Sequence, residues 1–98
     1  MTDNIEESTV TNNKAASRFE TDVDGLLAVA EYKVNNNVIT FTHTEVPREL
    51  EGRGVARRLI KTALDHARSE KLQVVPLCQF VASYIKRHPE YEELLPKP

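Results

Sequence analysis

Two short turn signals divide the first half of the chain into three runs of strand-forming residues. Asp24-Gly25 is typical of the two-residue hairpin turn in which both central residues adopt a positive φ. Asn35–Asn37 supplies a second turn, because asparagine tolerates the left-handed region at little cost. Strands joined by turns this short must run antiparallel. The sequence therefore predicts an antiparallel meander, with strands over 19–23, 26–34 and 38–46.

The third of these runs is rich in β-branched residues, and the pleat of a strand places alternate side chains on opposite faces. One face is expected to carry Ile39, Phe41, His43 and Glu45. Pro47 follows the strand and has no N–H to donate to a sheet ladder, so strand pairing should end there.

Apolar residues recur at helical spacing after Gly54 and form a single stripe. The stripe consists of Val55, Leu59, Ile60, Ala63, Leu64 and Ala67. The apolar run 72–77 is typical of a buried strand, and a second amphipathic helix ends at Pro89. This order predicts a mixed α/β (α+β) fold, in which the meander joins one βαβ crossover and two main helices pack on the sheet.

The 98 residues allow one domain, expected over 18–98 after a polar, flexible arm at 1–17. Thirteen Lys/Arg against 15 Asp/Glu exclude a generally basic nucleic-acid binder. No apolar run is long enough to span a membrane. One cysteine, three scattered histidines and a polar acidic start predict no metal site and a cytoplasmic protein.

The strongest chemical signal lies in Val46–Arg57, where a strand ends, a loop with two glycines follows and a helix begins. Gly52 and Gly54 permit a backbone path that Cβ atoms would block. The first N–H groups of the helix and its dipole together form an anion site. Residues 48–71 hold seven Lys/Arg against four Asp/Glu, whereas the rest of the chain holds six against eleven. This pattern indicates either a phosphate site or a helix entry with a solvated arginine face.

The residues expected around a phosphate-bearing ligand are Val46, Arg48, Gly52, Arg53, Gly54, Val55, Ala56 and Arg57. Because the dipole effect fades beyond the first turn, Arg53 and Arg57 are expected to act on phosphates. Lys61 and Arg68 are expected to be solvated bystanders.

The stretch Glu51–Ala56 resembles the acyl-coenzyme A loop of the GNAT superfamily of N-acetyltransferases, Gln/Arg-x-x-Gly-x-Gly/Ala. Gly54 and Ala56 match the last two fixed positions, and Glu51 stands where Gln or Arg is usual. Longer motifs in the same order resemble the minimal GNAT-like proteins of the YjdJ type. These motifs are Ala16–Glu20, Phe41–Pro47, Pro76–Phe80, Tyr84-Ile85 and His88–Tyr91.

The resemblance implies a truncated GNAT-like fold without the helices that usually cover the acceptor site. It also implies acetyl-coenzyme A bound between the third strand and the crossover strand, and transfer of the acetyl group to an amine. The acceptor is unknown, either a protein or a small molecule. The open site suits the end of a protein or a polyamine as acceptor, and the chain is expected to be a monomer or a weak dimer. A coenzyme A-binding or sensing module without turnover is the alternative function.

Three residues are candidates for catalysis. Cys78 precedes a helix, whose N-terminus favours a thiolate, and the resemblance places it near the acyl group. His43 is the candidate base, with Glu45 as the second choice. Tyr84 is the candidate acid, because GNAT enzymes often use a tyrosine on the corresponding helix. Each has a structural alternative: a buried cysteine, a hydrogen-bonded histidine and a tyrosine packed in the core.

Overall fold

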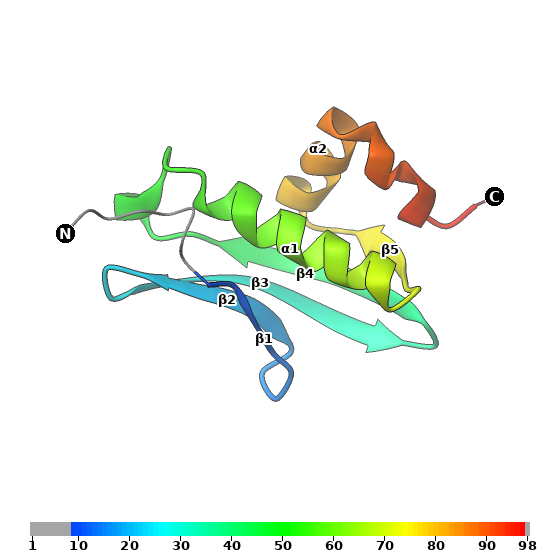
Figure 1. Ribbon diagram of the computed structural model, residues 1–98, viewed down its shortest axis with the longest axis horizontal. Coiled ribbons are helices and arrows are strands. Elements are labelled where there is room, and N and C mark those ends of the chain that lie inside the picture. Colours follow the sequence, from blue (N-terminus) through cyan, green and yellow to red (C-terminus); the bar gives the residue numbers. More distant parts are fainter. Residues whose placement is uncertain (1–8, 98) are drawn as a thin grey trace.

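The computed structural model describes residues 9–97, through which one five-stranded sheet runs in sequence order (Figure 1). The strands are β1 (Thr11–Asn13), β2 (Arg18–Val23), β3 (Leu26–Asn35), β4 (Val38–Glu45) and β5 (Gln73–Pro76). The α-helices are α1 (Val55–Ser69) and α2 (Gln79–Arg87), and the 3-10 helices are η2 (Arg48–Leu50) and η3 (Pro89–Leu94). Strands β1 to β4 are antiparallel, and β5 pairs with β4 in parallel after the α1 crossover. The predicted meander with one βαβ crossover is confirmed.

Both predicted turns adopt the left-handed backbone that their residues favour. Asp24 and Gly25 have φ of 55° and 80°, and the Asp22 carboxylate accepts a hydrogen bond from the Gly25 N–H at 3.0 Å. Asn36 and Asn37 have φ of 53° and 65°. The meander is thus defined by residues that adopt positive φ without severe strain.

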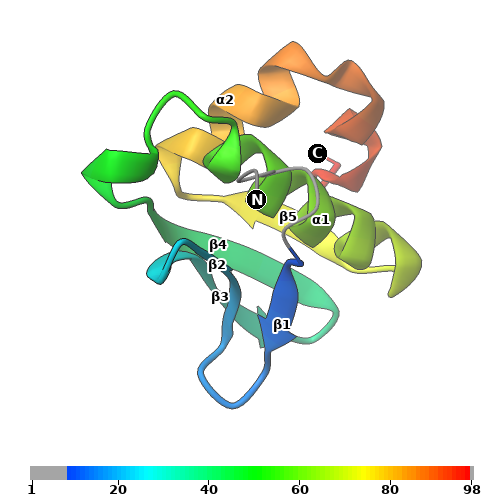
Figure 2. The same cartoon turned by 60° about the vertical axis from the view of Figure 1, so that its left-hand side comes forward.

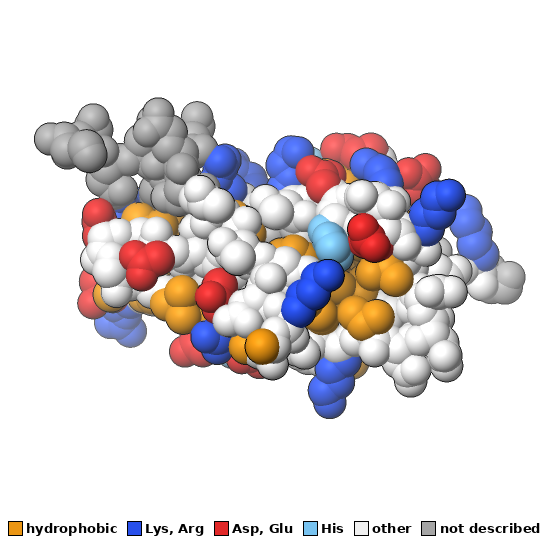
Figure 3. Space-filling view, turned by 60° about the horizontal axis from the view of Figure 1, so that its bottom comes forward, with side chains coloured by type: hydrophobic (Ala, Val, Ile, Leu, Met, Phe, Trp, Pro, Cys, Tyr) orange, Lys and Arg blue, Asp and Glu red, His pale blue; other side chains and the backbone are white. Residues whose placement is uncertain are grey.

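The core lies between the sheet and the two α-helices, which cover the same face of the sheet (Figures 1 and 2). All six residues of the predicted α1 stripe are buried. Phe19 packs against Tyr32 with ring centroids 5.4 Å apart. Figure 3 shows the opposite face, where charged side chains lie beside hydrophobic ones.

The N-terminal boundary differs from the prediction of a flexible arm over 1–17. Thr11–Asn13 pairs with β2 as strand β1, and the Tyr32 hydroxyl donates a hydrogen bond to Asn12 Oδ1 at 2.6 Å. Composition concealed this strand because its three residues are polar, and its attachment comes from backbone pairing with β2 and from the Asn12 hydrogen bond. Residues 1–8 lie outside the described residues.

A bulge in β4 changes which side chains face the helices. Phe41 pairs with Tyr32 and His43 with Glu31, so Thr42 is the extra residue between these pairs. Phe41 and Thr44 are consequently both buried, with 1% and 9% of their surface exposed, whereas the His43 side chain is 56% exposed. The predicted placement of His43 on the same face as Phe41 is wrong. The predicted placement of Glu45 on that face is wrong for the same reason, because Glu45 is exposed.

Candidate functional site

A groove begins where β4 and β5 separate. β5 pairs with β4 along Val38–Phe41, and the Cys78 N–H then donates to the Phe41 carbonyl at 3.0 Å. The chain turns into α2 at Gln79, so β5 does not continue beside the last residues of β4. The edge of the chain from Thr44 to Val46 becomes one wall of the groove. An extended ligand with amide groups can add to such an edge as a strand would.

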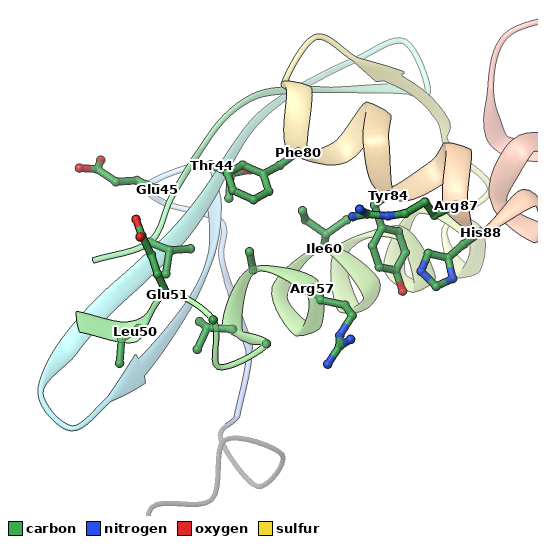
Figure 4. Close-up of a pocket in the computed structure, with 15 residues that line it drawn as sticks. Thr44, Glu45, Leu50, Glu51, Arg57, Ile60, Phe80, Tyr84, Arg87 and His88 are labelled. Atoms are coloured by element: carbon green, nitrogen blue, oxygen red, sulfur yellow. The ribbon is translucent and has the colours of Figure 1, made fainter. Parts of the chain in front are cut away.

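The groove has a volume of about 860 Å³ and lies between the end of β4, the glycine loop, α1 and α2 (Figure 4). Six of the eight residues predicted around a phosphate ligand line it: Val46, Gly52, Gly54, Val55, Ala56 and Arg57. Arg53 lines an adjoining cavity instead, and its guanidinium lies 3.7 Å from the Asp24 carboxylate. Arg48 belongs to η2 and lies outside both cavities.

Two left-handed glycines carry the loop into α1, as the sequence predicted. Gly52 and Gly54 have φ of 81° and 80°, and Gly54 is the residue immediately before α1. The Gly54 carbonyl accepts the first helical hydrogen bond, from the Arg58 N–H at 3.1 Å. Leu50, 1% exposed, anchors the loop in a small apolar cluster. The first N–H groups of α1 lack intrahelical acceptors and are available to an anion.

Acidic residues and nitrogen-bearing residues line different ends of the groove. Glu45 and Glu51 lie at one end, and the guanidinium groups of Arg57 and Arg87 and the imidazole of His88 lie at the other (Figure 4). Phe80 lies between the two ends and is 51% exposed, which is unusual for a large apolar side chain.

Sequence reasoning missed Phe80 and Arg87 as groove residues, because both belong to the amphipathic pattern of α2. Their spacing from Tyr84 is the signal that could have found them. Phe80 lies four residues before Tyr84 and Arg87 lies three residues after it, so both share the helical face of Tyr84.

Tyr84 lies in the groove wall, and its side chain extends between Arg57 and His88 (Figure 4). Its ring stacks on the His88 imidazole, with centroids 4.0 Å apart and planes at 24°. A phenol is protonated at neutral pH, and burial raises the pKa of Tyr84 further above its ordinary value. The predicted proton donor therefore lines the groove in its acidic form.

Cys78 lies behind the groove wall. The residue is 8% exposed, and its thiol donates to the Thr44 hydroxyl at 3.2 Å. Thr44 lines the groove, and Cys78 is outside the set of lining residues. His43 lies on the other face of the sheet, with Nε2 at 3.6 Å from Glu45 Oε1. The structure does not bring the predicted nucleophile and base together.

Arg68 lines neither cavity, but it is not merely solvated. Its guanidinium donates to the Glu90 carbonyl at 2.7 Å, pairs with Glu93 at 3.0 Å and lies 4.8 Å from the Tyr91 ring centroid. The Tyr91 hydroxyl in turn donates to Asp65 at 2.6 Å. Burial opposes ionisation of Asp65, but hydrogen bonds from Tyr91 and Lys61 hold the pKa of this carboxyl below its ordinary value. These contacts fasten η3 to α1.

Residues 18–94 match the profile of the GCN5-related N-acetyl-transferase family. The chain belongs to this family. Members of the GNAT family generally use acetyl-coenzyme A as acyl donor. A GCN5-like protein from Staphylococcus aureus, solved by NMR, superposes with a TM-score of 0.71 at 28% identity, covering 92% of this chain and 89% of that one. The truncated GNAT-like fold is confirmed.

Curated relatives of this GNAT chain include Protein NATD1 from Gallus gallus and from Homo sapiens. Both are 36% identical over 66 residues, which is 67% of this chain. The match spans 59% of the chicken protein and 58% of the human one. Across residues 9–97, no helix combines the length and apolar character that a bilayer crossing requires. The same residues contain no cluster of three His, Cys, Asp or Glu side chains suited to a metal ion.

Proposed function

We propose that the groove binds acetyl-coenzyme A and that this GNAT protein transfers the acetyl group to an amine. The observation that carries the proposal is the junction at Gly54. A left-handed glycine there opens α1 directly onto the groove, beside the free edge of β4. Phosphates would bind the first N–H groups of α1, with Arg57 beside them. The amide groups of the pantetheine arm would pair with the chain at Thr44–Val46.

In the proposed reaction, the amine nitrogen attacks the thioester carbonyl and the carbon–sulfur bond breaks. A backbone N–H near Val46 would polarise the carbonyl oxygen. Tyr84 would give its phenolic proton to the departing thiolate and regain one from water. The attacking amine must arrive as a free base and releases its proton to solvent at the open groove. Direct attack needs no acetyl-thiol intermediate, and we propose that Cys78 shapes the wall through Thr44.

A first test is thermal unfolding with and without coenzyme A. A ligand that binds only the folded state stabilises it by about 2.7 kcal/mol at one hundred times its Kd. For a domain of this size, that raises Tm by roughly 10 °C or more. An unchanged Tm in millimolar coenzyme A would contradict the proposed binding site.

A coenzyme A-binding module without turnover is the second candidate, and the positions of the two predicted bases favour it. The Glu45 carboxylate points away from the groove in Figure 4, and His43 lies on the opposite face of the sheet. Release of free coenzyme A thiol from acetyl-coenzyme A, measured with a panel of primary amines, separates the two functions. Binding without amine-dependent release would establish the module.

A further inference from the structure

A second cavity of about 370 Å³ adjoins the groove on the flank of α1. It shares Gly54, Arg57 and Tyr84 with the groove, so one ligand can extend from one cavity into the other. Its remaining lining residues are Arg53, Arg58, Lys61 and Thr62. Four of the described lining residues are cationic and none is acidic, although the chain as a whole has a net charge of −2.

Helical spacing explains why these side chains gather. Arg57 and Lys61 are four residues apart, as are Arg58 and Thr62, so two adjacent rows of α1 face the same cavity. The carboxylate that pairs with Lys61 at 3.0 Å belongs to Asp65, which is outside the cavity lining. This pair raises the pKa of Lys61 and keeps its ammonium charged. The described lining of the cavity therefore contains cationic groups, whereas the carboxylates of Asp65 and Asp24, which pair with Lys61 and Arg53, lie outside it.

We propose that this second cavity is a subsite for a phosphate monoester on the ligand that occupies the groove. This inference rests on the proposed function, in which the phosphate monoester is the 3′-phosphate of coenzyme A. The backbone N–H groups at the start of α1 would bind the pyrophosphate. The 3′-phosphate is a separate anion and needs hydrogen-bond donors of its own. Arg58 and Lys61 supply charged donors, and Thr62 supplies a hydroxyl.

The chemistry of the lining favours a phosphate over a nucleobase. Tyr84 is the aromatic residue of this lining, and its ring already stacks on His88. Guanidinium and ammonium groups bind phosphate oxygens through charge-assisted hydrogen bonds. Cations that only attract the ligand from a distance would favour the more negatively charged of two ligands wherever those cations lie on the surface, so loss of any nearby cation would reduce that preference.

The test is isothermal titration calorimetry with coenzyme A and with 3′-dephospho-coenzyme A, which differ by the proposed phosphate. The wild-type protein should bind coenzyme A about tenfold more tightly, as one or two charge-assisted hydrogen bonds would produce. Lys61→Gln and Arg58→Gln should each reduce this ratio and leave the affinity for dephospho-coenzyme A unchanged. Lys86→Gln is the matched control, because Lys86 is exposed on α2 and lines neither cavity.

The outcomes separate the subsite from the proposed function. Equal affinities of the wild-type protein for the two ligands would overturn the subsite and leave coenzyme A binding in place. Absence of binding by both ligands would overturn the proposed function and the subsite with it. If Lys86→Gln reduced the ratio as much as Lys61→Gln does, diffuse charge attraction would replace the subsite. Unfolding curves of the variants check that each one remains folded.

Discussion

Replacement of Gly54 by alanine tests whether the glycine loop is the anion site. Gly54 has a φ of 80°, and an L-residue in this region costs about 1–2 kcal/mol. A Cβ at this position would lie 3.0 Å from Arg57 Nη2, so the guanidinium would have to shift by a few tenths of an ångström at the mouth of the loop. We therefore expect Gly54→Ala to reduce both stability and affinity for coenzyme A.

Gly25 provides a matched control for the backbone strain. It has the same φ of 80°, lies in the turn between β2 and β3, and would place a Cβ with nothing within 4 Å. Gly25→Ala and Gly54→Ala should each lower Tm by about 4–16 °C, since 1 kcal/mol shifts Tm by 4–8 °C in a domain of this size. The Tm increase on adding coenzyme A should persist in Gly25→Ala and shrink strongly in Gly54→Ala.

Thermal unfolding with and without coenzyme A measures both quantities, and calorimetry at a temperature where each variant is folded measures Kd directly. If coenzyme A raised the Tm of Gly54→Ala as much as it raises the Tm of the wild-type protein, the assignment of the loop as the anion site would be refuted. A lost increase in Gly25→Ala would show that strain alone, far from the groove, abolishes binding. In that case the reasoning from the Arg57 contact would fail.

Three further changes probe the rest of the site and its support. Tyr84→Phe should lower kcat and leave the KM for acetyl-coenzyme A unchanged in steady-state assays, and an unchanged kcat would remove Tyr84 as proton donor. Cys78→Ala should retain most activity, whereas near-complete loss would indicate a covalent acetyl-thiol route. Tyr91→Phe removes the hydrogen bond to Asp65 and should cost about 1 kcal/mol in urea unfolding. Because this contact lowers the pKa of Asp65 from about 3.8, its stabilisation is present above that value and is lost as pH falls through the lower folded value. Tyr91→Phe should therefore flatten the acid limb of the stability profile, and an unchanged limb would contradict the assignment.

Local chemistry explains the features that the sequence predicted well. The turn at Asp24-Gly25 depends on residues that adopt positive φ, and the α1 stripe depends on a repeat of 3.6 residues. Gly54 at the start of α1 was likewise predicted from its conformational freedom. Each of these signals lies within a few neighbouring residues, so no distant part of the chain is needed to interpret it.

Contacts between distant segments account for features that were missed. Arg68 and Glu93 are 25 residues apart, and only the docking of η3 on α1 brings them together. Strand β1 was missed for a related reason, because its attachment depends on hydrogen bonds such as Tyr32 to Asn12, 20 residues away. The sequence does not show whether a polar side chain forms its hydrogen bonds with water or with another part of the protein.

The amino-acid sequence alone determined the order of β2 to β5 and the two α-helices, the two turns and the glycine loop that opens α1. The tertiary structure alone decided which β4 side chains reach the groove. The period-two pattern places His43 with Phe41, but pairing with β3 leaves Thr42 as an extra residue and turns Thr44 inward instead. The physical reason is that a bulge depends on the register between two strands, and a pattern within one strand carries no information about that register.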